Sequence, residues 1–172
     1  EEEGYAPSEI PELILTHNLY GTEIDPRAGA LAAFALTMKA RAKQRTFFTK
    51  QVEPRICVIK PISFSPNELD SLVSKDGDKH AEEAFWNQFT EADTLGSLIK
   101  PNLGLTTRLT MHLDSCDDES DLLMVDVIVR AKHAVRQAGF LARNYAAVVA
   151  NPPYMGGGNM GPALTRFGKE TH

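Results

Sequence analysis

The side chains at residues 151–154, Asn-Pro-Pro-Tyr, could together bind a planar substrate that carries an exocyclic amine. They follow an apolar, strand-forming run at residues 145–150, and ligands of open α/β folds bind at the carboxyl ends of strands. The amide oxygen of Asn151 and the backbone carbonyl after it can accept both amine hydrogens, which aims the nitrogen lone pair at an electrophile. Pro152 and Pro153 hold this geometry rigid, and Tyr154 can stack on the ring. The alternative is an ordinary Pro-rich turn after a strand.

A second group of polar residues lies between a short apolar strand at 17–22 and a helix predicted from Pro26 to about Lys43. Asp25 is a favourable N-cap, and Pro26 suits the first helical position. An acidic residue after the second strand of a nucleotide-binding βαβ unit can bind ribose hydroxyls. We assign that role to Glu23, with Ile24 covering one face of the adenine. The alternative is that Glu23 and Asp25 both merely cap the helix.

Alternating strands and helices predict a parallel α/β sheet. We expect strands at 17–22, 55–59 and 145–150, and helices at 26–43, 66–72, 79–90 and 120–138. Gly139 is expected to end the last helix in a left-handed conformation, while residues 1–12 and 155–162 read as loops. No glycine-rich turn follows a first strand, and Gly156–Gly158 is not followed by helix-capping residues. A phosphate-binding loop is therefore not predicted.

Composition narrows the class of protein. The chain has 172 residues, a net charge of -5 and 42% hydrophobic residues, which corresponds to one globular domain. No apolar run reaches the length of a membrane span, and neither the two cysteines nor the five histidines have metal-ligand spacing. These features predict a cytoplasmic protein without a metal site. The acidic balance argues against this chain alone holding a DNA duplex by its phosphates.

Longer stretches carry a specific resemblance. Residues 18–28 (Asn-Leu-Tyr-Gly-Thr-Glu-Ile-Asp-Pro-Arg-Ala), 31–40, 96–99 (Gly-Ser-Leu-Ile) and 148–156 (Val-Val-Ala-Asn-Pro-Pro-Tyr-Met-Gly) resemble PglX-type adenine-specific (N6) DNA methyltransferases of bacterial BREX phage-exclusion systems. Asn-Pro-Pro-Tyr is also similar to the signature of other amino-methyltransferases that use S-adenosyl-L-methionine, including the glutamine methyltransferases of release factors. Spacing favours the first family, because Glu23 and Asn151 are roughly 130 residues apart, whereas a compact core needs about two βα units of some 30 residues each.

The resemblance implies a role for each site residue. Glu23 would bind the cofactor ribose, and Ile24 would pack on its adenine. Asp93, just before Gly-Ser-Leu-Ile, would accept from the adenine amine of the cofactor, with Glu91 as a competitor and a polar turn residue as the alternative. Asn151 and Pro152 would hold the target amine, Pro153 would keep the turn rigid, and Tyr154 would stack on an adenine flipped out of the duplex.

The same resemblance sets expectations for fold and partners. The expected fold is a partial Rossmann-like methyltransferase domain over 1–172 that lacks the first strand and the C-terminal part, with a helical insertion at about 61–118. Double-stranded DNA would be bound through regions outside this chain, other BREX proteins are possible partners, and the isolated chain is expected to be inactive. The alternatives are a protein glutamine N-methyltransferase and a non-catalytic fragment with a structural or interaction role.

Overall fold

The computed structural model describes residues 4–116, 122–150 and 161–171, and it divides the chain into two compact units at Ile59/Lys60. The first unit contains the helix α1 (Ile10–Leu13), the π-helical turn η1 (Ile14–Asn18), the strand β1 (Tyr20–Glu23), the helix α2 (Pro26–Lys43), the 3-10 turn η2 (Phe47–Lys50) and the strand β2 (Arg55–Val58). Strand, helix and strand follow one another here, as expected from the sequence.

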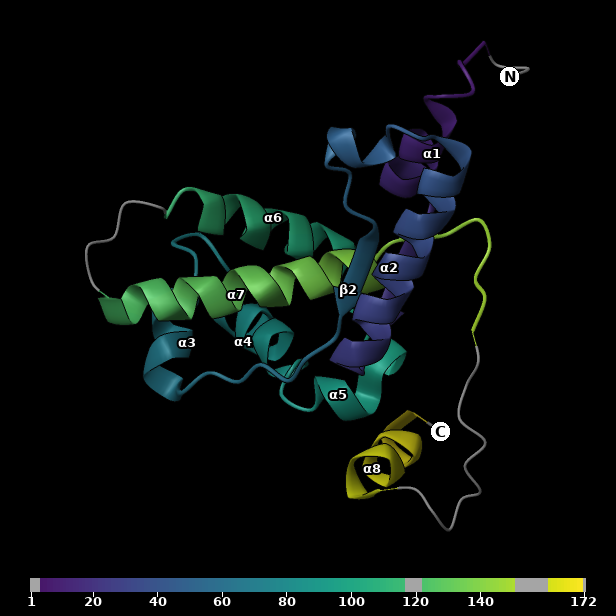
Figure 1. Cartoon of the computed structure of the whole chain (residues 1–172). Coiled ribbons are helices and arrows are strands. Elements are labelled where there is room, and N and C mark those ends of the chain that lie inside the picture. Colours follow the sequence, from purple (N-terminus) through teal and green to yellow (C-terminus); the bar gives the residue numbers. More distant parts are fainter. Residues whose placement is uncertain (1–3, 117–121, 151–160, 172) are drawn as a thin grey trace. The chain divides into compact units, whose positions relative to one another are not determined.

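The two strands of the first unit are parallel and in direct register, from Tyr20 opposite Arg55 to Glu23 opposite Val58. The helix α2 connects them and packs along β2 (Figure 1). Gly29 permits this close approach, because a Cβ atom at this position would lie 2.8 Å from Cγ2 of Val58. Two neighbouring parallel strands joined by a helix form a βαβ unit. The predicted parallel α/β character is therefore confirmed for β1 and β2.

The second unit is helical over its described residues. It contains α3 (Pro66–Leu72), α4 (Lys79–Asn87), α5 (Ala92–Leu95), the 3-10 turn η3 (Gly96–Leu98), α6 (Leu103–Asp114), α7 (Leu122–Leu141) and α8 (Pro162–Thr171). Trp86 is completely buried, and its ring meets the rings of Phe85 and Phe64 edge to face, with centroids 5.0 and 5.7 Å apart. Leu109 and Leu113 of α6 and Ala131 of α7 are also buried. This packing of aromatic and aliphatic side chains forms the core of the unit.

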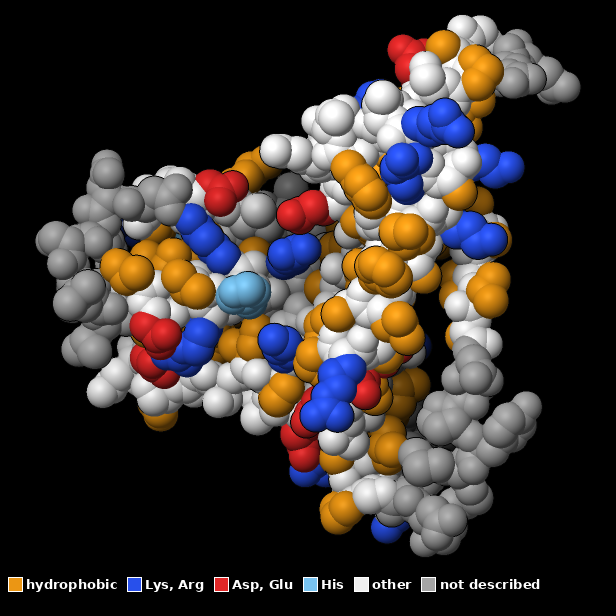
Figure 2. Space-filling model, viewed as in Figure 1, with side chains coloured by type: hydrophobic (Ala, Val, Ile, Leu, Met, Phe, Trp, Pro, Cys, Tyr) orange, Lys and Arg blue, Asp and Glu red, His pale blue; other side chains and the backbone are white. Residues whose placement is uncertain are grey.

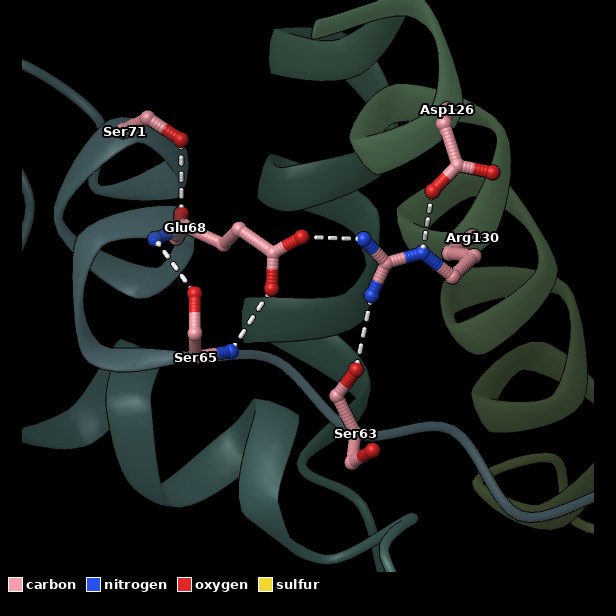
Figure 3. A network of polar contacts seen from close by, with 6 residues as sticks. All are labelled: Ser63, Ser65, Glu68, Ser71, Asp126 and Arg130. Carbon is pink, nitrogen blue, oxygen red and sulfur yellow. Dashed lines mark hydrogen bonds and ion pairs between the residues drawn. The ribbon is translucent and has the colours of Figure 1, made fainter. Parts of the chain in front are cut away.

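Polar side chains connect α3 to α7 (Figure 3). Ser65 and Glu68 form a capping box, in which Glu68 Oε2 accepts from the Ser65 N–H at 2.6 Å. Glu68 Oε1 also accepts from Arg130, and Arg130 donates to Asp126 Oδ2 at 2.8 Å and to the Ser63 carbonyl at 2.7 Å. The Ser65 backbone hydrogen bond, followed by the Arg130 hydrogen bond, lowers the pKa of Glu68 below its ordinary value. One arginine thus ties the start of α3 to the middle of α7.

Several sequence expectations differ from the structure. Gly139 does not end a helix, because α7 continues to Leu141. Neither α6 nor α8 was predicted, and Pro162, expected in a loop, begins α8. The strand expected at 17–22 is a π-helical turn up to Asn18, followed by a strand at Tyr20–Glu23. Residues 145–150 form no strand, and Val148 and Val149 are 77% and 99% exposed. Residues 1–12 are not all loop, since α1 begins at Ile10. An apolar run becomes a strand only where a neighbouring strand pairs with its backbone groups, and within the described residues β1 and β2 pair only with each other.

Two further observations concern the whole described part of the chain. None of its helices is both long enough and apolar enough to cross a lipid bilayer. Nowhere in residues 4–116, 122–150 and 161–171 do three or more His, Cys, Asp or Glu side chains gather as a metal ion would require. The predicted insertion at about 61–118 covers α3 to α6, and its status as an insertion into a methyltransferase domain stays a prediction.

Candidate functional site

Glu23 is the last residue of β1, and its backbone and side chain are both held. Its carbonyl oxygen accepts from the Ile59 N–H at 2.7 Å, one residue beyond β2. Its carboxylate Oε1 accepts from the N–H groups of Ile24 and Asp25 at 2.8 and 3.1 Å. Within the described residues, Oε2 has no hydrogen-bond partner. The carboxylate is therefore fixed through one oxygen and can accept a ligand hydroxyl with the other.

Asp25 has a different role from Glu23. Its Oδ1 accepts from the Arg27 N–H at 2.8 Å, its backbone is extended, and α2 begins at Pro26. This is the N-cap predicted from the sequence, and it is confirmed. Glu23 bonds only N–H groups that precede the helix, so it does not share the capping role. Asp25 therefore caps α2 and Glu23 does not, which excludes the alternative that both acids cap the helix.

Ile24 lies between β1 and α2 and is 51% exposed. An exposed aliphatic side chain directly after a fixed carboxylate offers an apolar surface beside a hydroxyl-binding group. Both residues stand at the carboxyl end of β1, the end of a parallel strand at which α/β folds bind ligands. Residues 23 and 24 therefore place a hydrogen-bond acceptor beside an exposed apolar side chain, and the role of the pair toward a cofactor stays a prediction.

Asp93 lies in the first turn of α5, in the second unit. It is exposed, and Thr94 Oγ1 approaches its Oδ1 at 3.5 Å. The competing Glu91 is engaged in an ion pair with Arg166 of α8. Gly96 follows with φ of 52°, in the left-handed region that favours glycine. Asp93 thus has the freer carboxylate, and its role toward a cofactor stays a prediction.

The four residues of the Asn-Pro-Pro-Tyr motif, Asn151, Pro152, Pro153 and Tyr154, lie outside the described residues. Their predicted roles are neither supported nor contradicted by the structure. Among the predicted site residues, the structure brings together Glu23 and Ile24 in the first unit. Asp93 belongs to the second unit.

A buried carboxylate in the second unit was not anticipated from the sequence. Glu82 of α4 is fully buried, and it accepts from the N–H and hydroxyl of Ser74 at 2.8 and 2.6 Å and from Arg108 at 2.8 Å. A signal was present in the sequence, because Glu82 shares the apolar face of α4 with Phe85 and Trp86, three and four residues later. An acid on such a face indicates a buried partner rather than a catalytic group.

Comparison with known protein families gives a direct result. The sequence model described as Eco57I restriction-modification methylase matches residues 17–171, which is most of the chain and includes β1, α2 and the Asn-Pro-Pro-Tyr motif. The chain belongs to this methylase family. The match begins just before the strand that carries Glu23.

Two related proteins are similar over almost all of the chain. The adenine-specific methyltransferase BrxX of Escherichia coli O9:H4 (strain HS) is 31% identical over 99% of this chain. The adenine-specific methyltransferase PglX of Lacticaseibacillus casei (strain Zhang) is 28% identical over 97% of it. The chain spans 16% and 14% of the length of these two relatives. The resemblance to PglX-type methyltransferases, predicted from the sequence, is confirmed.

Proposed function

We propose that this chain contributes a ribose-binding carboxylate and a target-amine motif to an enzyme that methylates N6 of adenine in double-stranded DNA. The observation that carries the proposal is Glu23, fixed through Oε1 at the carboxyl end of β1 with Oε2 left to accept. Membership of a restriction-modification methylase family and two relatives named adenine-specific methyltransferases support it. The same names weigh against the glutamine methyltransferase alternative.

The carboxylate of Glu23 and the exposed side chain of Ile24 suit S-adenosyl-L-methionine, which has a ribose with two hydroxyls and an adenine. Glu23 would accept from the ribose hydroxyls, Ile24 would cover the adenine, and Asp93 would accept from its amine. The cofactor, when bound, supplies an electrophilic methyl group. In this proposal Asn151 and the carbonyl of Pro152 accept the two hydrogens of the target amine.

The remaining motif residues would present the target. Pro153 would keep the turn rigid, so that little conformational entropy is lost when the substrate binds. Tyr154 would stack on the adenine after it leaves the duplex, because a stacked and paired adenine hides its amine. The amine proton can leave once methyl transfer has begun, so no strongly shifted general base is required. A role in phage defence together with other BREX proteins, in the cytoplasm, follows from the PglX resemblance as part of the same proposal.

Two substitutions in the full-length protein test the cofactor role. Glu23→Gln keeps an oxygen for the Ile24 and Asp25 N–H groups but removes the charge that strengthens hydrogen bonds from hydroxyls. Asp25→Asn removes one charge two residues away and keeps a good N-cap. We expect Glu23→Gln to weaken S-adenosyl-L-methionine binding about ten- to hundredfold in isothermal titration. Asp25→Asn should leave the affinity close to that of the wild type.

The reaction itself is tested by mass spectrometry of products. Wild-type protein should convert adenine in duplex DNA to N6-methyladenine and leave glutamine-containing peptides unmodified. Equal loss of cofactor affinity in both variants would show a general charge effect and contradict the role of Glu23. Methylation of the peptides instead of DNA would contradict the proposed substrate.

A further inference from the structure

An apolar groove lies on the first unit between the α1–η1 segment and the C-terminal half of α2. It encloses about 420 Å³, and Ile14 and Leu19, which line it, are 39% and 42% exposed. Leu36 of α2 forms part of the opposite wall. While the groove is empty, its apolar side chains are in contact with water. Covering them with the apolar groups of a ligand is therefore favourable.

Two lysines of α2, Lys39 and Lys43, also line this groove. They are four residues apart on one helix, which places them side by side with Cβ atoms about 6 Å apart. Both are exposed, and neither has an ion-pair partner among the described residues. Nearby cations are engaged, since Lys50 bonds Glu12 and Arg41 lies over the Phe48 ring. The groove therefore combines an apolar floor with two available positive charges.

The segment that contains α2 is strongly basic. All six charged residues between Pro26 and Val52 are basic, although the chain as a whole has a net charge of -5. Figure 2 shows Lys and Arg side chains gathered around the end of α2 next to α1, with hydrophobic side chains along the helix. A partner for this surface must bring negative charge and apolar groups together.

The groove is separate from the candidate cofactor site. Asp25 caps the N-terminus of α2, beside Glu23, whereas Lys39 and Lys43 lie in its last turns. An 18-residue helix is about 27 Å long at 1.5 Å per residue. A cofactor bound at Glu23 therefore does not reach the groove. A DNA backbone suits it poorly, because the sugar–phosphate chain has no apolar side chains to fill it.

We propose that this groove docks an acidic amphipathic helix of a protein partner. Such helices present apolar anchors at i, i+3, i+4 and i+7 to a hydrophobic groove. The anchors would contact Ile14, Leu19 and Leu36. Two carboxylates four residues apart on the flank of the partner helix would pair with Lys39 and Lys43, and this pairing sets the specificity and orientation of docking.

A charge-exchange experiment on the 172-residue chain tests this proposal. The probe is a fluorescent helical peptide with leucines at i, i+3, i+4 and i+7 and pairs of glutamates four residues apart. A matched peptide carries lysine in place of every glutamate. Fluorescence anisotropy at low ionic strength should show the glutamate peptide binding at least about tenfold more tightly than the lysine peptide. The Lys39→Glu/Lys43→Glu double variant should reverse this preference.

The control is Arg27→Glu/Arg45→Glu, which changes the net charge equally but alters no residue that lines the groove. It should keep the preference for the glutamate peptide. Ile14→Ala should weaken both peptides severalfold. Tighter binding of the lysine peptide by the Lys39→Glu/Lys43→Glu variant requires a folded groove. A misfolded variant would therefore not give the expected result.

Three outcomes would overturn the proposal. The first is that the wild type does not prefer the glutamate peptide, or that the Lys39→Glu/Lys43→Glu variant keeps the preference. The second is that a short DNA duplex binds in place of the glutamate peptide and loses affinity on charge reversal, which would make the surface a nucleic-acid contact. The third is a dimer in sedimentation that Ile14→Ala dissociates while no peptide binds, which would make it an interface between copies of this chain.

Discussion

The fully buried carboxylate of Glu82 accepts a hydrogen bond at 2.8 Å from Arg108, although the two residues are 26 positions apart. Glu82 also accepts from the N–H and the hydroxyl of Ser74, at 2.8 and 2.6 Å. This carboxylate thereby connects α4, α6 and the segment before α4. Its contacts satisfy a charge that would otherwise destabilise the interior.

We predict that Glu82→Ala lowers the free energy of unfolding by about 2–4 kcal/mol, because it removes three hydrogen bonds, including those from the N–H and hydroxyl of Ser74. The matched control is Glu83→Ala on the same helix, which loses a partly exposed contact to Lys79 at 3.6 Å and should cost at most about 0.5 kcal/mol. Urea denaturation followed by circular dichroism measures both. Equal effects of the two variants would contradict the assigned importance of Glu82.

The lowered pKa of Glu68 predicts a pH dependence of stability. The larger cause of the lowered pKa is the hydrogen bond from the Ser65 N–H, and the second is the hydrogen bond from Arg130. A carboxyl whose folded pKa is depressed stabilises the protein above its unfolded pKa, and this contribution is lost as pH falls through the folded pKa. Since the ordinary pKa of a glutamate is 4.5, the melting temperature should decrease as the pH is lowered from 4.5 through the folded pKa.

Glu68→Gln should remove this part of the acid dependence. Arg130→Met should reduce it without removing it, since the Ser65 hydrogen bond remains. Thermal melts of the three proteins between about pH 3 and pH 7 give the comparison. An unchanged pH profile in Glu68→Gln would show that other carboxyl groups govern acid unfolding.

Asn151→Ala in the full-length protein should nearly abolish DNA methylation and leave S-adenosyl-L-methionine binding close to normal. In the proposed role Asn151 contacts the target amine, and losing such a contact costs about 3 kcal/mol, or roughly a hundredfold in rate. Single-turnover kinetics and isothermal titration measure the two quantities. Asn144→Ala, seven residues earlier, is the control and should keep full turnover. Lost cofactor affinity with normal turnover at saturation would reverse the assignment.

Tyr154 separates base stacking from a structural role. Tyr154→Phe should be tolerated, because the aromatic face remains, whereas Tyr154→Ala should lose about 1–3 kcal/mol of stacking. The loss should shrink when the target adenine lies opposite a mismatch, because unpairing then costs less. Turnover on paired and mismatched duplexes, compared with thermal melts, distinguishes the cases. Equal losses on both duplexes with a lower melting temperature would indicate a core aromatic.

Local signals predicted the elements around the candidate site. Asp25 and Pro26 define the start of α2, because an N-cap and a first-turn proline act on the backbone within a few residues. Glu23 was predicted beside the end of a strand, since an apolar run followed by acidic residues indicates that place. The sequence also contains a local signal for α6, because the N-cap Asn102 is followed by leucines four residues apart.

Other features depended on contacts between distant residues. Gly139 has the local properties of a helix terminator, yet α7 continues through it, and the Tyr145 hydroxyl bonds the Phe140 carbonyl at the end of the helix. The run at 145–150 is as apolar as a strand requires, but strand formation also needs a paired neighbour.

The sequence by itself determined the helix α2, its N-cap Asp25 and the methylase family. It left open whether Glu23 also caps α2, which the hydrogen bonds of Glu23 in the structure decided. Only the tertiary structure decided which charges meet. Glu68 and Arg130 are 62 positions apart, and the groove joins residues near Ile14 to Lys39 and Lys43. The physical reason is range, because capping and turn preferences act over a few residues. Burial and ion pairing depend instead on which distant segments pack together to remove apolar surface from water.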